Sequence, residues 1–230
     1  MSKTSRPTFG SLFAGIGGFD LGLERAGWKP AWQVEIDPFC RKVLQRHWPE
    51  VPKFEDVREV GRHNLAPVDL ICGGFPCPVV SRAAHGRNAG EWLWPEFARI
   101  IRLLQPKFAL VENVNGLRER RLGEVLGDLA EIGYDAEWNV LPASLFGAPH
   151  KRARVWVVAY SDSYSKSNGS VYDETSFLSE LEVPFKRWVD PVTYIRVDDG
   201  FSQRLACEKY GNAVVPQIVE WIGRRLLEYV

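Results

Sequence analysis

The chain has 230 residues, 45% of them hydrophobic and 25% charged, which is typical of a globular protein with a sizeable core. Lysine plus arginine and aspartate plus glutamate both number 29, and this zero net charge neither indicates nor excludes a nucleic-acid partner. No apolar run approaches the roughly 20 residues of a membrane span, and residues 1–10 lack the apolar stretch of a secretory signal. The four cysteines show no CxxC spacing, so we expect no zinc site and a reduced, cytoplasmic setting.

Short apolar runs alternate with helix-like stretches over the first two thirds of the chain. Residues 9–18, FGSLFAGIGG, predict a strand that leads into a glycine turn, and residues 19–27 predict a helix that Gly27 ends. Further strands are predicted at residues 31–37, 68–74, 108–114, 136–144 and 154–160. Further helices are predicted at residues 38–48, 94–105, 122–133 and 216–230. This alternation predicts an α/β fold with a mainly parallel sheet and helices on both faces.

The glycine turn at residues 13–18 is a candidate cofactor site. It follows a predicted strand and opens a helix, an arrangement in which backbone can approach a ligand closely. The next strand ends in Glu35 and Asp37, about 20 residues on, where an acid can hydrogen-bond a ribose diol. A plain turn and a solvated carboxylate remain the alternative. Since no Lys-Ser/Thr pair follows the turn, the pattern favours a nucleoside cofactor over a nucleoside triphosphate.

Cys77 stands between two prolines at the end of a predicted strand. Its thiol would be only about 10% ionised near pH 7.5, so a nucleophile there needs help from its surroundings. By itself, such a cysteine is more often inert. The next strand ends in VENV, which brings Glu112 and Asn113 to the same rim of the sheet. A thiol, an acid and a nucleoside pocket on adjacent strand ends predict an active site.

Three further polar stretches of the sequence lie outside the predicted strands and helices or at their starts. Arg152 and Arg154 are two residues apart, which predicts that both lie on one side of an extended segment. They would order the acid or grip a nucleotide, although a solvated charged edge has the same pattern. Residues 82–88 are compatible with a mobile catalytic loop or a plain surface loop. Residues 161–176 are polar and aperiodic, and we expect a loop or a flexible insertion there.

Six stretches of the chain resemble the DNA (cytosine-5) methyltransferase family. They are LFAGIGGFDLGLERAGW, EIDPFC, GGFPC, ENV, GAPHKRAR and YGNAVVPQI, and they occur in the family's order over most of residues 8–159 and 203–230. The resemblance implies a Rossmann-like S-adenosylmethionine-dependent methyltransferase fold with a small recognition insertion. It implies a catalytic, cofactor-binding domain at residues 1–160, a reduced target-recognition insertion at 161–202, and a segment at 203–230 that returns to the catalytic domain.

The resemblance also implies the residues that hold the cofactor, S-adenosylmethionine. They are Phe13, Gly15, Ile16, Gly18, Glu35, Ile36, Asp56, Val57, Pro76, Leu93, Asn212 and Ala213. Among them, Phe13 would meet the adenine and Glu35 would take the ribose hydroxyls. Asp56 and Val57 would lie at the adenine edge.

For catalysis the resemblance implies Cys77, Glu112, Arg152 and Arg154. Cys77 would add to C6 of cytosine, Glu112 would hydrogen-bond N3 and the exocyclic amine, Arg154 would lie at O2, and Arg152 would support the acid. The implied partner is duplex DNA with the target cytosine flipped out of the helix. No metal and no membrane are implied. DNA contacts are expected from Ser81, Arg82, Arg87 and Lys151.

The chain departs from the family's usual pattern. Ser11 stands where the family usually has aspartate, Pro78 where it usually has glutamine, and Pro149–His150 where it usually has Pro-Gln. Only about forty residues occupy the interval in which family members commonly carry a substantial recognition domain, so we expect a short sequence preference. Three other possibilities stay open: the same chemistry on RNA, the same chemistry on a free cytosine nucleotide, or a noncatalytic cofactor- or DNA-binding subunit. A restriction companion and a phage self-protection enzyme are equally compatible with the sequence.

Overall fold

The computed structural model describes residues 6–77, 91–161 and 213–230. Its strands are β1 (Thr8–Leu12), β2 (Lys29–Val34), β3 (Lys53–Phe54), β4 (Leu70–Gly73), β5 (Phe108–Val114), β6 (Tyr134–Pro142) and β7 (Ala153–Ser161). Its helices are α1 (Gly18–Ala26), α2 (Pro38–His47), α3 (Trp94–Leu104), α4 (Leu117–Arg120), α5 (Leu122–Glu131) and α8 (Pro216–Leu227). Two 3₁₀ turns, η1 (Val57–Glu59) and η2 (Ala143–Phe146), complete the regular structure of these ranges.

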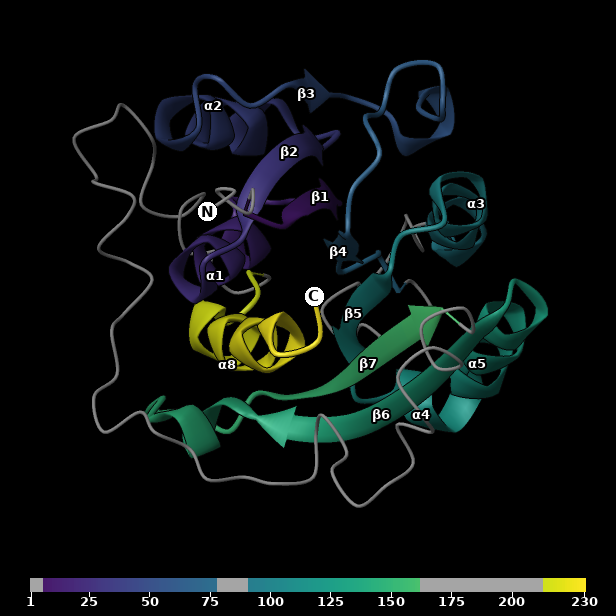
Figure 1. Ribbon diagram of the computed structural model, residues 1–230. Helices are drawn as coiled ribbons and strands as arrows, with labels where there is room; N and C mark the ends of the chain where they lie inside the picture. Colours follow the sequence, from purple (N-terminus) through teal and green to yellow (C-terminus); the bar gives the residue numbers. More distant parts are fainter. Residues whose placement is uncertain (1–5, 78–90, 162–212) are drawn as a thin grey trace.

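The strands form one seven-stranded sheet in the order β3-β2-β1-β4-β5-β7-β6 (Figure 1). Neighbours from β3 to β5 pair in parallel, and β7 is antiparallel to both β5 and β6. The predicted α/β architecture with a mainly parallel sheet is therefore confirmed. The sequence prediction missed the two-residue β3 and the single-turn helix α4, which are too short to show a periodicity.

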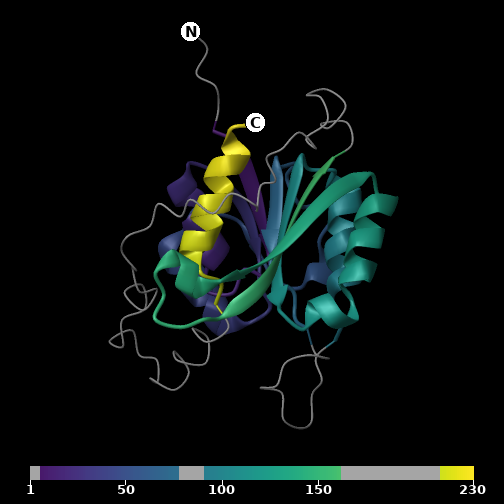
Figure 2. The same ribbon diagram turned by 90° about the horizontal axis from the view of Figure 1, so that it is seen from below.

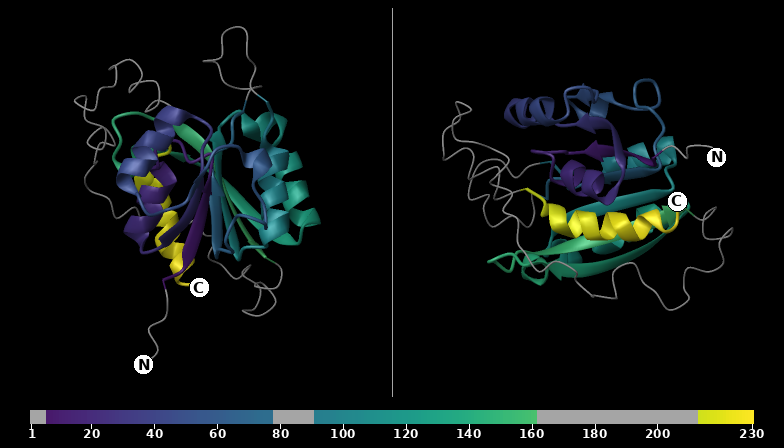
Figure 3. Two further views of the ribbon diagram at one scale, coloured as in Figure 1. Left: turned by 90° about the horizontal axis from the view of Figure 1, so that it is seen from above. Right: turned by 60° about the vertical axis from the view of Figure 1, so that its left-hand side comes forward.

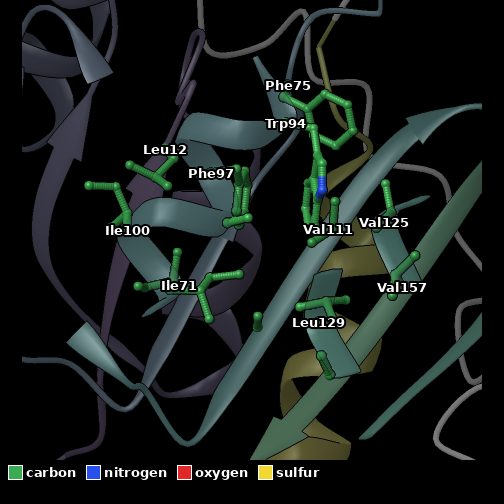
Figure 4. Packing of buried hydrophobic residues seen from close by; sticks show 14 of the residues in the cluster. Leu12, Ile71, Phe75, Trp94, Phe97, Ile100, Val111, Val125, Leu129 and Val157 are labelled. Atoms are coloured by element: carbon green, nitrogen blue, oxygen red, sulfur yellow. The ribbon is translucent and has the colours of Figure 1, made fainter. Parts of the chain in front are cut away.

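Helices cover both faces of the sheet (Figures 2 and 3). On one face, α1 and α8 enclose a core that includes Phe19, Trp156 and Ile218. On the other face, α3 and α5 enclose a core that includes Trp94 and Leu129, and Figure 4 shows these side chains between the helices and the strands. The sheet is thus shielded on both sides, as a mainly parallel sheet requires, and its strand ends remain as the place for a ligand.

The boundaries of α1 and α2 follow from local chemistry. Gly27 closes α1 in the left-handed conformation (φ 112°), and its N–H donates to the carbonyls of Leu23 and Glu24. Asp37 begins α2: its carboxylate accepts from the N–H groups of Phe39 and Cys40, and a proline occupies the first turn. The glycine turn thus leads directly into α1, which begins at Gly18, and the Glu35–Asp37 segment leads directly into α2.

Helix α8 brings the C-terminal segment back onto α1. A Cβ atom at Gly22 would lie 2.6 Å from the Pro216 carbonyl oxygen, so only glycine allows the two helices to approach this closely. The Trp28 indole donates to the Gly223 carbonyl at 2.9 Å. This contact ties the end of α1 to the middle of α8, while a Cβ atom at Gly18 would lie 2.8 Å from the Val214 carbonyl oxygen, which places the residues before α8 beside the start of α1. Among the described residues, no helix has the length and apolarity that crossing a membrane requires.

A buried polar cluster lies behind the glycine turn. Asp20 of α1 is fully buried, and its carboxylate accepts from Ser11 Oγ at 3.1 Å and Gln33 Nε2 at 2.8 Å. Burial raises the pKa of Asp20 to about 6, although the hydrogen bonds from Gln33 and Ser11 oppose that rise. The hydrogen bonds of this carboxylate link α1 to β1 and β2, but its burial away from water costs free energy of folding when the group is ionised.

We expect Asp20→Asn to stabilise the protein above pH 6. The pKa of Asp20 is about 6 in the folded state against an ordinary value of 3.8, so stability falls as pH rises between these values and stays lower above them. The gain at pH 8 should be up to about 3 kcal/mol, since each pKa unit corresponds to about 1.4 kcal/mol. Asparagine can still accept from Gln33.

Urea unfolding at pH 8 and at the lowest pH where both proteins remain folded would measure this difference. The gain should shrink toward acid pH, and the exposed Glu50→Gln is the control. Equal stability of Asp20→Asn and the wild type at pH 8 would show that the buried charge carries no penalty.

Candidate active site

The glycine turn at residues 13–17 exposes its backbone beyond the end of β1. Phe13, Gly15 and Gly17 all have positive φ angles, of 53°, 56° and 89°. A Cβ atom built at Gly15 would meet nothing within 4 Å, so this part of the turn is open to a ligand. The Phe13 ring stacks at 6.3 Å on the buried ring of Phe97, which fixes its orientation.

Glu35 is built into this turn. Its carboxylate accepts from the Gly15 N–H at 2.7 Å and from the Asp37 N–H at 2.8 Å. The residue is only 9% exposed, which differs from the solvated carboxylate that was the alternative. An ionised carboxylate has about four acceptor sites, and this one lies at the turn, where a ligand hydroxyl would meet it.

A cavity of about 330 Å³, open to solvent, joins the turn to the ends of β4 and β5. It is lined by Phe13, Ala14, Gly15, Ile16, Gly18, Phe19, Gly74, Glu112, Ala213 and Val214. Five of the residues predicted to bind the cofactor are among these, and so is Glu112, one of the residues predicted to be catalytic. The cavity therefore brings the predicted cofactor turn and the predicted acid into one space.

The remaining predicted cofactor residues are not in the lining of this cavity. Ile36 is 63% exposed beside Glu35. Asp56 caps η1 and pairs with Arg58 at 2.8 Å, and the hydrogen bonds from Arg58 lower its pKa. Val57 is buried, Pro76 is exposed and Leu93 is half-buried at the start of α3. Their roles in cofactor binding stay predictions.

Cys77 follows β4 by four residues and is half-buried. Phe75, two residues earlier, is fixed by its ring, which lies 5.1 Å from Trp92 and 5.5 Å from Trp94. Its carbonyl accepts from the Asn113 side-chain amide at 2.9 Å. The buried Asn113 therefore ties the segment before Cys77 to the end of β5. Sequence reasoning brought Asn113 to this rim but gave it no role, because the pairing with Phe75 spans 38 residues.

Glu112 is a buried acid with a cationic partner. Its Oε1 lies 3.1 Å from Arg154 Nε, and a Cβ atom at Gly74 would lie 2.8 Å from its Oε2. Glycine at position 74 thus leaves the room that the carboxylate occupies. Burial raises the pKa of Glu112, while the charges of Arg154 and Arg152 oppose the rise. A buried acid with a raised pKa retains its proton to higher pH, which suits a group that must donate a hydrogen bond.

Arg152 and Arg154 both act on Glu112, but not through strand alternation. Arg152 lies one residue before β7 and has a φ of 28°, so the predicted extended geometry over these two arginines is wrong. The reason is the turn before β7, which sequence alternation does not reveal. The Arg152 guanidinium instead donates to the Ala213 carbonyl at 2.8 Å.

Other predicted residues lie elsewhere. Ser81, Arg82, Arg87 and Asn212 fall outside the described residues, as does the predicted loop at 82–88. So does the predicted loop at 161–176 apart from Ser161, which ends β7, so its prediction as loop is wrong because the strand pairing extends one residue past the apolar run. Lys151 is exposed, and its carbonyl accepts from the Ala143 N–H at 2.8 Å. Cys40, Cys72 and Cys77 are thiols rather than disulfides. Within the described ranges, no cluster of three or more histidine, cysteine, aspartate or glutamate residues could hold a metal ion.

Comparison with known sequences decides the family. The sequence profile described as C-5 cytosine-specific DNA methylase matches residues 8–191. The chain belongs to this family. It is 34% identical over 159 residues to the Type II methyltransferase M.NgoBI of Neisseria gonorrhoeae, a match that covers 66% of this chain and 50% of the relative. It is 28% identical over 186 residues to the Type II methyltransferase M.HhaI of Haemophilus parahaemolyticus, which covers 76% and 57%.

Solved structures agree with this assignment. An E. coli prophage protein described as a DNA modification methyltransferase superposes with a TM-score of 0.59 at 28% identity, covering 68% of this chain and 47% of that one. The Dnmt2 methyltransferase of S. pombe superposes with a TM-score of 0.57 at 19% identity, covering 68% and 50%, which shows a common fold. The predicted S-adenosylmethionine-dependent methyltransferase fold is thus confirmed. The chain spans about half the length of the curated relatives it matches.

The cofactor of this family is S-adenosylmethionine, and the geometry of the described residues fits it. The open backbone at Gly15 admits a ligand. The buried Glu35 carboxylate lies at that turn, and a carboxylate is an acceptor that suits the hydroxyls of a diol. Apart from Glu112, the residues that line the adjoining cavity are glycines or carry apolar side chains, which is compatible with the methyl-bearing part of such a molecule.

We expect Glu35→Ala to weaken S-adenosylmethionine binding by roughly 1–3 kcal/mol, the range for hydrogen bonds to a charged group. The mutation removes the predicted ribose contact together with the acceptor of the Gly15 N–H. Isothermal titration calorimetry measures the affinity, and Glu50→Ala is the matched control because Glu50 is an exposed glutamate beyond the end of α2. Unchanged affinity in Glu35→Ala would return Glu35 to a structural role in the turn.

Proposed function

We propose that the protein methylates C5 of cytosine in DNA, with S-adenosylmethionine as the methyl donor and Cys77 as the nucleophile. The observation that carries the proposal is the position of Glu112. It faces the cavity lined by the glycine turn, and Arg154 lies against its carboxylate. An acid whose pKa burial has raised therefore lies beside a pocket that fits the cofactor, close to the segment that holds Cys77.

The proposed reaction begins on a cytosine flipped out of the duplex, which costs a few kcal/mol. The Cys77 thiolate adds to C6, and Glu112 donates a hydrogen bond at N3 while it accepts from the exocyclic amine. Arg154 lies at O2 and keeps the carboxyl in place. Addition at C6 makes C5 enamine-like and hence nucleophilic. The bound cofactor supplies the electrophilic methyl group. A base then removes the C5 proton, and the Cys77 thiolate leaves C6 as the C5–C6 double bond re-forms.

Residue roles beyond these belong to the same proposal. Phe13, Gly15, Ile16, Gly18 and Ala213 line the cofactor cavity, which supports their assignment to cofactor binding. Glu35 supports the turn and would take the ribose hydroxyls.

Ile36, Asp56, Val57, Pro76, Leu93 and Asn212 are carried into the proposal by the family motifs alone. So are the DNA contacts of Ser81, Arg82, Arg87 and Lys151. The bacterial Type II methyltransferase relatives support a place for the protein in restriction–modification and a cytoplasmic setting.

We also propose the division of the chain into a catalytic domain at 1–160, a reduced target-recognition insertion at 161–202 and a returning segment at 203–230. The packing of α8 on α1 supports the last of these, because residues 213–230 complete the face of the sheet that carries the glycine turn. Recognition of a flipped cytosine would then depend on few contacts outside the catalytic domain.

We expect Cys77→Ser to abolish methyl transfer while S-adenosylmethionine affinity stays within a few-fold of the wild type. A serine hydroxyl is hardly ionised at neutral pH, so it cannot add to C6, whereas the cofactor cavity does not include this side chain. Tritiated methyl transfer measures turnover, and calorimetry measures affinity. Cys72→Ser is a control thiol substitution, since Cys72 is buried in β4.

The same assay, run on duplex DNA, transfer RNA and deoxycytidine monophosphate, tests the substrate. The proposal expects transfer to duplex DNA. Transfer only to RNA or to the nucleotide would keep the chemistry and change the substrate. No transfer to any of the three, with intact cofactor binding, would favour the noncatalytic subunit.

A further inference from the structure

Arg152 occupies an unusual backbone position. Its φ of 28° lies where residues with a side chain rarely fall, and such a conformation persists only when the surroundings hold it. The Arg152 guanidinium donates a hydrogen bond to the Ala213 carbonyl at 2.8 Å, and the two residues are 61 positions apart in the sequence. The strained residue therefore joins the start of β7 to the segment that precedes α8.

The Ala213 end of this contact belongs to the cofactor cavity. Ala213 and Val214 line it together with the glycine turn. A Cβ atom at Gly18 would lie 2.8 Å from the Val214 carbonyl oxygen, so the segment is pressed against the first residue of α1. The residue next to the carbonyl that Arg152 binds is thus packed against the start of α1, directly after the glycine turn.

The charge of Arg152 acts at the other end on Glu112. Burial raises the pKa of Glu112, and the charge of Arg152 opposes this rise in concert with that of Arg154. The two arginines differ in the contacts described for their guanidinium groups. Arg154 contacts Glu112 directly at 3.1 Å, whereas Arg152 has its described hydrogen bond with Ala213. The Arg152 guanidinium thus hydrogen-bonds Ala213 in the wall of the cavity, and its charge acts on Glu112, which lines the same cavity.

We propose that Arg152 is a positioning residue that couples cofactor binding to the state of Glu112, so that the cofactor and the cytosine-bearing duplex bind cooperatively through it. Cofactor that orders Ala213–Val214 also fixes the guanidinium near Glu112, and thermodynamic linkage makes the effect reciprocal. The proposal rests on the proposed function. In the proposed function Arg152 only supports the acid, and here it also controls the affinity for the cofactor.

The test is a linkage cycle with S-adenosylhomocysteine as the unreactive cofactor probe. The dissociation constant of a cytosine-containing duplex is measured with and without the probe for wild type, Arg152→Met and Arg154→Met. In the wild type the probe should tighten duplex binding roughly fivefold or more, the usual lower range of such couplings. In Arg152→Met this enhancement should fall below about twofold, and probe affinity without DNA should drop about tenfold, as expected for a lost charged hydrogen bond.

Arg154→Met is the matched control. It should reduce methyl transfer strongly, because it removes the direct partner of Glu112, yet leave probe affinity within about twofold, since Ala213 keeps its partner. The pH–rate profile gives a second readout. The charge of Arg152 opposes the rise in the Glu112 pKa, so its removal in Arg152→Met should shift the part of the pH–rate profile that reports Glu112 to higher pH. Arg152→Lys keeps a positive charge and should show a smaller shift. Thermal unfolding checks that each variant is folded.

Two outcomes would overturn the coupling role. One is an Arg152→Met protein that keeps both wild-type probe affinity and wild-type enhancement. The other is a wild type that methylates the duplex but whose duplex binding does not respond to the probe. A wild type that binds the probe yet neither binds nor methylates the duplex would instead overturn the proposed function, and the drop in probe affinity of Arg152→Met would still report on the contact with Ala213.

Discussion

The parallel pairing of β4 with both β1 and β5 is the constraint on which the candidate site depends. In this register Leu12 lies beside Gly73, and Gly73 lies beside Val111. The residue that follows each of these, Phe13, Gly74 and Glu112, lines the same cavity. Since a Cβ atom at Gly73 would come within 2.2 Å of the Leu12 carbonyl oxygen, the close approach of these strands requires glycine there.

Electrostatics then decide what this rim can do. A buried carboxylate without a partner would cost several kcal/mol, and Arg154 offsets this cost for Glu112. The compensation is partial, because burial still raises the pKa of the acid. Such an acid keeps its proton to higher pH than an exposed glutamate does, which suits a hydrogen bond to a ring nitrogen. Cys77, the proposed nucleophile, lies on a segment that Asn113 and an aromatic cluster fix, so acid and thiol are positioned by the same strand end.

Much of this arrangement could be predicted from the sequence. The glycine turn, the helix that ends at Gly27 and the apolar strand segments have local signals, and parallel strands with glycine and acidic ends predict a shared rim. The antiparallel direction of β7 was not predicted, because an apolar run reads the same in either direction. The contacts of Asn113 with Phe75 and of Arg152 with Ala213 join residues 38 and 61 positions apart, and no local pattern signals them.

The central claim, that Cys77 attacks cytosine, is tested most directly by covalent trapping. A duplex with 5-fluorocytosine at a position that the protein methylates carries fluorine where the C5 proton would be removed. The covalent adduct between Cys77 and C6 therefore cannot break down. With S-adenosylmethionine present, the account predicts a protein–DNA band that survives a denaturing gel and a nucleotide mass on the peptide that contains Cys77. No such band under conditions where ordinary duplex is methylated, or a nucleotide on another residue, would contradict it.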